Sequence, residues 1–267
     1  MKKSKLLLFL IFLPFVLVAQ IDTLELNKAF SRKCWSDTKA VFTAPAHWDG
    51  RDWTTFGAVT ASTAALFLVD DPVAEAFETF HLHEGDGGER FSSHFLEPWG
   101  AKYSLAIMGG FIGYGLLSKD LKSQSTGLLA LESFALASLF VQIPKRLIGR
   151  NRPDMGPNVS PYEIGGPFSG TSLPSGHTTA VFAVASVIAN QYADTKLVPV
   201  ISYAIATAAG LSRIYDGRHW LSDVVAGAAM GIAVGNLVSH KKNKSKRVVV
   251  VPFTSGEIKG IRLALSL

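Results

Sequence analysis

Three short blocks of the sequence hold residue types that suit the transfer of a phosphoryl group. They are Lys145 to Pro153 (KRLIGRNRP), Pro174 to His177 (PSGH), and Ser212 to Asp223, whose polar members include Arg213, His219 and Asp223. A phosphoryl group in transfer needs its equatorial oxygens held by fixed positive charge, because positioning and electrostatics supply most of the catalysis. The blocks therefore predict a site for a phosphate group.

The positive charge would come from Lys145, Arg152 and Arg213. Arginine offers a planar fork that matches phosphate, and lysine offers a mobile point charge. Alone, the first block is more typical of a basic cluster beside an apolar helix. The other two blocks favour a phosphate site.

Ser175-Gly176-His177 leads directly into an apolar helix predicted over 178–193. Serine is a good N-cap, and glycine lets backbone N–H groups approach an anion closely. The unpaired N–H groups and partial positive charge of a helix N-terminus also attract phosphate. An ordinary capped helix with a surface histidine is the alternative, equally favoured for this tetrapeptide alone.

His219 and Asp223 are four residues apart at the start of the last apolar segment, so they share one helix face. A carboxylate there can accept the imidazole Nδ1–H, which leaves Nε2 free to attack phosphorus. A structural pair is the alternative for an isolated His–Asp spacing. Arg213, just upstream, favours catalysis.

Together the blocks resemble the signature of the type 2 phosphatidic acid phosphatases, a superfamily that also holds class A acid phosphatases and vanadium haloperoxidases. All defining positions of Lys-x6-Arg-Pro, Pro-Ser-Gly-His and Ser-Arg-x5-His-x3-Asp are present in order, and the resemblance covers residues 126–239. It implies that His219 is the nucleophile, that Asp223 orients it and that His177 protonates the leaving oxygen. It also implies that water hydrolyses the phosphohistidine, that no metal or other cofactor takes part, and that phosphate is bound by Lys145, Arg152, Ser175, Gly176 and Arg213.

Several other polar residues have weaker claims to a function. His81 and His83 lack further ligands at zinc spacing. Asp70 and Asp71 are placed to cap a helix beginning at Pro72, and Glu97 opens a Glu-Pro-Trp-Gly stretch that suits a structural corner. Glu132, inside an apolar helix, is either functional or paired with an arginine of the catalytic loop. Cys34 is the only cysteine, so no internal disulfide can form.

The blocks lie between six apolar segments rich in small residues, which favour close helix packing. These segments run over 54–69, 103–118, 126–143, 178–193, 197–212 and 221–239. A separate amphipathic helix is predicted from Val73 to Phe80, followed by a loop from Glu84 to Glu89. The predicted fold is an all-α six-helix bundle, with a small C-terminal β-hairpin formed by 247–253 and 258–265.

The N-terminus has the features of a secretory signal peptide: lysines, an apolar run from Leu6 to Val18, and a small residue, Ala19, before the predicted cleavage point. An uncleaved anchor is the alternative. The predicted organisation is a signal peptide (1–19), an amphipathic leader (20–52), the phosphatase-like domain (53–239), and a basic linker with the hairpin (240–267). Removing three lysines from 26 basic and 21 acidic residues leaves a nearly neutral chain, which gives no support to nucleic-acid binding.

The composition and the lengths of the apolar segments do not decide whether the protein spans a membrane. A span needs about 20 apolar residues, and these segments have 16 to 19. An integral bundle is favoured over a soluble or peripheral one. A cleaved signal followed by three spans would place the catalytic loop inside the cell, whereas the basic run at 240–247 fits the positive-inside rule if the last helix crosses inward. We expect a bacterial-type envelope protein with an exocytoplasmic, periplasmic active site.

The expected activity is hydrolysis of lipid phosphates or pyrophosphates. Isoprenyl pyrophosphate, phosphatidic acid, phosphatidylglycerophosphate and lipid A all fit apolar helices beside a phosphate site, and the expected partners are such a lipid and the membrane. A vanadium haloperoxidase, a non-catalytic membrane protein that keeps the motif, and a phosphotransferase to alcohols are the alternatives. The oligomeric state stays open.

Overall fold

The structure, a computed structural model, describes residues 27–267 except 157–158, 240–247, 256–257 and 266–267. The prediction of a helical protein is confirmed, but the described residues contain eight α-helices rather than six. The additional ones are a helix before the first apolar segment and a short helix beside the catalytic loop. The predicted signal peptide, the start of the leader and the basic linker lie outside the described residues.

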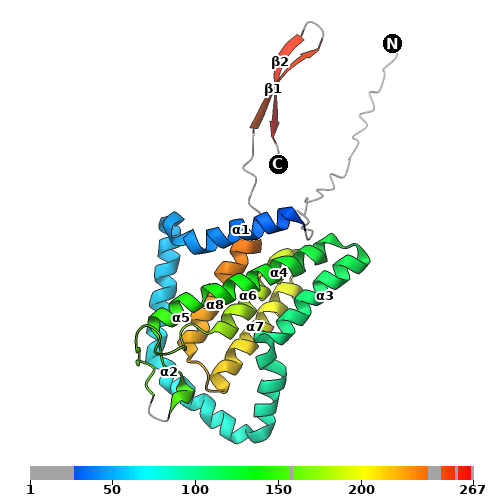
Figure 1. Ribbon diagram of the computed structural model, residues 1–267. Coiled ribbons are helices and arrows are strands. Elements are labelled where there is room, and N and C mark those ends of the chain that lie inside the picture. The colour runs from blue at the N-terminus through cyan, green and yellow to red at the C-terminus, as the bar shows by residue number, and fades with distance from the viewer. Residues whose placement is uncertain (1–26, 157–158, 240–247, 256–257, 266–267) are drawn as a thin grey trace, which may run out of the picture.

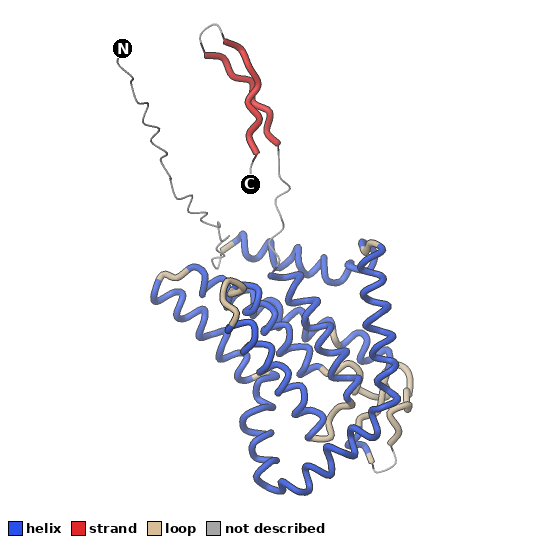
Figure 2. Tube along the Cα trace, turned by 180° about the vertical axis from the view of Figure 1, so that it is seen from behind, coloured by secondary structure: helices blue, strands red, loops and turns tan. Residues whose placement is uncertain are grey.

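The helices other than α1 and α5 pack together as a bundle, with α1 across one end and α5 with its adjoining loops away from α1 (Figures 1 and 2). The helices are α1 (Lys28–Thr43), α2 (Gly50–Phe91), α3 (Lys102–Ser118), α4 (Leu121–Phe140), α5 (Gln142–Ile148), α6 (Gly176–Gln191), α7 (Leu197–Tyr215) and α8 (Leu221–Ser239). Short turns follow α1 (η1, Ala44–His47), α2 (η2, Ser92–Leu96, and η3, Glu97–Gly100) and α5 (η4, Pro153–Met155). Strand β1 (Val248–Ser255) pairs antiparallel with β2 (Ile258–Leu265).

Helix α2 joins regions that the sequence predicts to be separate. It begins with a capping box at Asp49, runs for 42 residues and contains Pro72. The predicted loop from Glu84 to Glu89 is wrong, because these residues continue the helix. At Gly88 a Cβ would lie 2.1 Å from Tyr215 Oη, so the missing side chain lets α2 approach α7. This tertiary contact overrides the low helix propensity of glycine.

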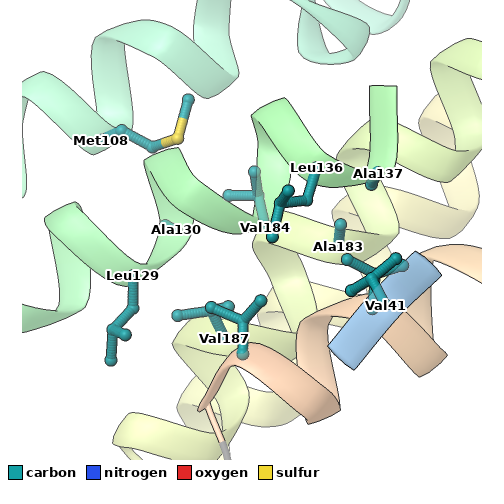
Figure 3. Packing of buried hydrophobic residues seen from close by; sticks show 11 residues of the cluster. Val41, Met108, Leu129, Ala130, Leu136, Ala137, Ala183, Val184 and Val187 are labelled. Carbon is teal, nitrogen blue, oxygen red and sulfur yellow. The ribbon is translucent and has the colours of Figure 1, made fainter. Parts of the chain in front are cut away.

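The central core lies between α1, α3, α4, α6 and α8. Met108, Leu129 and Val187 are among its buried side chains, and so are alanines such as Ala137 and Ala183 (Figure 3). Small side chains let the helix backbones approach each other closely. The bundle is therefore stabilised by close packing between helices rather than by large buried side chains.

A stripe of glycines brings α8 against α6. A Cβ at Gly227 would lie 2.6 Å from the Ser175 carbonyl oxygen, and one at Gly231 would lie 2.4 Å from that of Thr179. Any larger residue would push the helices apart. Because Gly227 lies one turn beyond Asp223, the stripe holds the start of α6 beside the start of α8.

Four helices of the described residues are long and apolar enough to cross a membrane: Gly50–Glu84, Leu121–Ile148, Leu197–Tyr215 and Leu221–Ser239. Large apolar side chains are also exposed on the outside of the helices, including Leu68, Leu116, Leu117, Leu139 and Val200. An apolar surface of this kind is stable in lipid and unfavourable in water. The protein is therefore a membrane protein.

Helix α1 contacts the bundle through Val41 in the core, through the Phe42 ring against Phe140, and through a half-buried lysine. Lys33 Nζ lies 3.2 Å from Glu132 Oε2, donates to the Val238 carbonyl oxygen at 3.0 Å and pairs with Asp37. The predicted pairing of Glu132 with an arginine of the catalytic loop is wrong, because α4 carries Glu132 toward α1. Burial and the adjacent Glu132 raise the pKa of the Cys34 thiol to about 11, so this thiol stays protonated.

Candidate active site

The N-terminus of α6 forms one wall of the site. Ser175 is the N-cap, and its Oγ accepts from the Thr178 backbone N–H at 3.5 Å, as the sequence predicts. Ser175 N donates to the Asp223 carbonyl oxygen at 2.9 Å, which ties this helix start to α8. Gly176 and His177 follow in the first turn, so the free N–H groups of the helix point toward the site.

Lys145 of α5 and Arg152 of the loop after it converge on one neutral acceptor. Lys145 Nζ donates to the Thr171 carbonyl oxygen at 2.8 Å, and Arg152 Nη2 donates to the same oxygen at 3.4 Å. Arg152 Nε is buried without a hydrogen-bond partner. Among the described residues neither cation forms an ion pair with a carboxylate. Lys145 is buried, whereas Arg152 is half-buried with its Nε covered. Cationic groups that are shielded from water and have no anionic partner are unfavourable, so this pair is suited to bind an anion.

Asp223 lies in the first turn of α8, and His219 lies in the bend two residues before that helix. The two are buried side by side, but not on one helix face as the sequence predicts. His219 Nδ1 lies 3.6 Å from Asp223 Oδ2 and 3.5 Å from Ser172 Oγ, and Ser172 donates to the same carboxylate oxygen. The Trp220 backbone N–H also donates to Asp223 Oδ2, at 3.0 Å. The carboxylate thus lies on the Nδ1 side of the ring, which favours the tautomer with an unprotonated Nε2.

The two histidines of the site have lowered pKa values. Burial lowers the pKa of His219 to about 4 against the opposing effect of Asp223, and Lys145 and Arg152 lower it further. Burial, followed by the charge of Arg213, lowers the pKa of His177 below its ordinary 6.5. His219 is therefore neutral above a pH of about 4, as a nucleophile must be. A bound anion would raise the pKa of His177 by opposing the nearby cations.

Arg213 lies in the last turn of α7 and lines a cavity together with His177 and His219. It pairs with Asp216, and its Nη1 lies 3.6 Å from Glu97 Oε1 in η3. Unlike Lys145 and Arg152, it is already neutralised by carboxylates. An anion would have to compete with these two acids for Arg213.

Two cavities meet at the histidines. The larger, about 420 Å³, is lined by Gly100, Ser138, Val141, Gln142, Lys145, Arg152, Thr171, Gly176, His177, Ala180 and His219. The smaller, about 190 Å³, is lined by Glu97, Arg152, His177, Arg213, Arg218 and His219. The two share Arg152, His177 and His219, so the predicted cations and both histidines line two adjacent cavities. Ser175 and Asp223 lie behind their walls.

Several residues of the site lie outside the sequence-based prediction. Asp70 and Arg150 are buried and bond to each other, so the predicted helix cap at Asp70 is wrong, since it lies in the middle of α2. Glu97 and Gly100 belong to the predicted corner, which in the structure lines the cavities. Nothing in the sequence marks Ser172 as a site residue except its position two residues before Pro174.

The part of the chain that carries the two histidines and the three cations is similar to known proteins. Residues 126–247 match the family model described as PAP2 superfamily. A lipid A 1-phosphatase of Rhizobium etli is 30% identical over 199 residues, which cover 70% of this chain and 82% of that protein. The chain belongs to the PAP2 superfamily.

Other relatives in the superfamily share less of their length with this chain. A lipid A 1-phosphatase of Porphyromonas gingivalis is 36% identical over 188 residues, 67% of this chain and 36% of that protein. Phosphatidylglycerophosphatase B of Bacillus subtilis is 35% identical over 129 residues, 45% of this chain and 60% of that protein. The chain thus spans about a third and three fifths of these two PAP2 relatives.

Proposed function

We propose that the protein is a phosphatase of membrane lipids that works through a phosphohistidine at His219. The observation that carries this proposal is the pair Lys145 and Arg152, two cations without carboxylate partners in the described residues, beside a neutral histidine backed by Asp223. The relatives named as lipid phosphatases support the same class of reaction.

In the proposed reaction His219 Nε2 forms a bond to phosphorus while the bond from phosphorus to the lipid oxygen breaks. Protonated His177 gives its proton to that oxygen, so the lipid leaves as an alcohol. Water then attacks phosphorus, His177 accepts a proton from it, and the phosphorus–nitrogen bond breaks. Inorganic phosphate leaves, and both histidines return to their starting states.

Lys145, Arg152 and the start of α6 would hold the phosphoryl oxygens through both steps. Arg213 would join them by exchanging Glu97 or Asp216 for a phosphate oxygen. Fixed cations stabilise the charge that develops in the transition state without needing to reorganise. They supply the positive charge that a metal ion provides in other phosphatases, so we propose a metal-independent reaction.

The substrate is proposed to be a phosphorylated lipid. The larger cavity extends from His177 toward Ser138, Val141 and Gln142 on α4 and α5, so a leaving group has room beside a membrane-spanning segment. Among the lipids expected from the sequence, a phosphorylated glycolipid of the lipid A kind is favoured by the names of two relatives.

We also propose that the site faces the exocytoplasmic side. Asp223 lies at the start of α8 and His219 just before it, whereas Val238 near the end of α8 contacts Lys33 of α1. The basic run 240–247 follows that far end, and the positive-inside rule places it in the cytoplasm. This orientation puts α1 on the cytoplasmic side, which is incompatible with a signal peptide cleaved after Ala19.

A substrate panel tests the proposed function. Purified protein in detergent is given lipid A, phosphatidylglycerophosphate, phosphatidic acid, an isoprenyl diphosphate and the soluble p-nitrophenyl phosphate, and released phosphate is measured. We expect hydrolysis of at least one lipid at a kcat/KM at least roughly 10²-fold above that of the soluble ester, because binding of the lipid body contributes to the rate. Equal hydrolysis of the soluble ester without detergent would remove the lipid specificity.

Gly100 offers a test of the position of His177. A Cβ at Gly100 would lie 2.1 Å from His177 Cδ2, so the methyl group of Gly100→Ala must displace the imidazole. We expect phosphate release to fall by roughly 10²-fold, the usual effect of a misplacement of about 1 Å. Gly109→Ala is the matched control, because nothing lies within 4 Å of its Cβ position. Equal activity of the two variants would show that His177 need not occupy this position.

A further inference from the structure

Two buried charges beside the site have no part in the proposed reaction. Asp70 of α2 and Arg150 of the loop after α5 both have side chains with 0% exposure, and Arg150 Nη2 donates to Asp70 Oδ2 at 2.7 Å. We propose that Asp70 and Arg150 are positioning residues that fix Asp223 and, through it, His219. The proposal rests on the function proposed above.

Arg150 is held by bonds at every guanidinium nitrogen. Its Nη1 donates to Asp223 Oδ1 and to Ser222 Oγ, both at 2.7 Å, and its Nε donates to the Pro161 carbonyl oxygen at 2.8 Å. The guanidinium also lies 3.9 Å from the centre of the Phe67 ring. A planar fork with this many contacts has one available orientation, which lysine could not reproduce.

Asp70 connects this arginine to the first turn of α8. Its Oδ1 accepts from the Ser222 backbone N–H at 2.9 Å, and its Oδ2 accepts from Ser222 Oγ as well as from Arg150. The residue after Ser222 is Asp223. Asp70 therefore holds both the cation that binds Asp223 and the backbone that carries it.

The two oxygens of Asp223 have different partners as a result. Oδ1 is taken by Arg150, whereas Oδ2 accepts from Ser172 and Trp220 and faces His219 Nδ1. Because Arg150 occupies one oxygen, the carboxylate cannot rotate without breaking a charge-assisted bond. Asp223 Oδ2 therefore stays oriented toward His219 Nδ1.

The network also sets the charge beside the imidazole. One guanidinium and two carboxylates leave one net negative charge next to His219, which gains positive charge as Nε2 bonds to phosphorus. Replacing Asp70 by a neutral residue would leave Asp223 cancelled by Arg150, so the developing imidazolium would lose its counter-charge.

The variant Asp70→Asn in the full-length protein tests the proposal. We expect kcat toward the best lipid of the panel to fall roughly 10–100-fold, the usual effect of losing a group that orients a functional ligand, while KM stays within about a factor of two because no phosphate contact changes. Glu132→Gln is the matched control, because it also replaces a buried, ion-paired carboxylate by an amide, at the α1 contact. A purely structural role predicts that both variants lose thermal stability and keep kcat.

A second measurement does not depend on activity. Nitrogen NMR of histidine-labelled protein in detergent reports the tautomer of His219, which can be assigned by its loss in His219→Ala. We expect the Nδ1–H tautomer in the wild type and in Glu132→Gln, and a mixture in Asp70→Asn. If Asp70→Asn does not fold, Ser222→Ala removes the hydroxyl that bridges Arg150 and Asp70, and the same changes are expected to a smaller degree.

The outcomes separate this inference from the proposed function. An unchanged His219 tautomer and an unchanged kcat in Asp70→Asn would overturn the positioning role. If the wild type hydrolyses no lipid of the panel, the proposed function fails, and the NMR comparison still decides whether Asp70 and Arg150 orient His219.

Discussion

His219→Ala is expected to abolish phosphate release, with kcat reduced by roughly 10⁴-fold or more, as for other enzymes that lose their nucleophile. The His219 imidazole supplies the nitrogen that bonds to phosphorus in the proposed covalent intermediate. His177, the other histidine that lines both cavities, is proposed to serve as the proton donor instead. Incubation with a ³²P-labelled lipid phosphate and rapid quenching should trap acid-labile radioactivity on the wild type and none on the variant.

His83→Ala is the control for this loss. His83 is exposed on α2, and its ring Nδ1 bonds to the Thr79 carbonyl oxygen within its own helix. We expect wild-type turnover and labelling from this variant. Residual turnover of His219→Ala near the wild-type rate would mean that water attacks the substrate directly, or that the motif serves as a scaffold only.

Asp223→Asn is expected to affect both catalysis and folding. An amide can donate to Nδ1 and thereby favour the wrong imidazole tautomer, which in a serine protease lowers kcat about 10⁴-fold. Asp223 is also one of the two carboxylates bonded to the buried Arg150. Leaving that cation partly uncompensated should lower the free energy of unfolding by roughly 3 kcal/mol. Lipid phosphate hydrolysis and chemical unfolding in detergent measure the two effects separately.

The control for the stability effect is Asp194→Asn. Asp194 pairs with Lys122 at 3.4 Å, but its side chain is 68% exposed. Solvent screening limits such a surface pair to about 1 kcal/mol or less, and the pair lies outside both cavities. If Asp223→Asn loses no more stability than Asp194→Asn, the buried network does not depend on the Asp223 charge.

Local sequence patterns predicted which segments form helices more accurately than they predicted where each helix begins and ends. The apolar segments from 103 onward lie in α3, α4, α6, α7 and α8, because helix formation there follows from composition and spacing. The glycine-rich stretch from Glu84 to Glu89 misled the prediction, since Gly88 has its reason in the ring of Tyr215, more than a hundred residues away in the chain.

Much of the candidate site could be predicted because its residues occur at fixed short spacings. Ser175 caps the helix that starts at Gly176, and His219 lies four residues before Asp223, so each contact joins residues that are close in the chain. The ion-pair partners of the arginines, by contrast, could not be predicted from local spacing. Nothing local distinguishes Arg152, which faces a cavity, from Arg150, which is fully buried.

The order of residue types along the chain already provides cations, two histidines and a helix start suited to phosphoryl transfer. Which of these charges are free to meet a substrate depends on the tertiary structure. Asp70 neutralises part of Arg150 and Glu97 lies beside Arg213, whereas the described residues offer Lys145 and Arg152 no carboxylate. The reason is physical: an ion pair forms between groups that packing brings within a few ångströms, and helices distant in the chain supply these partners.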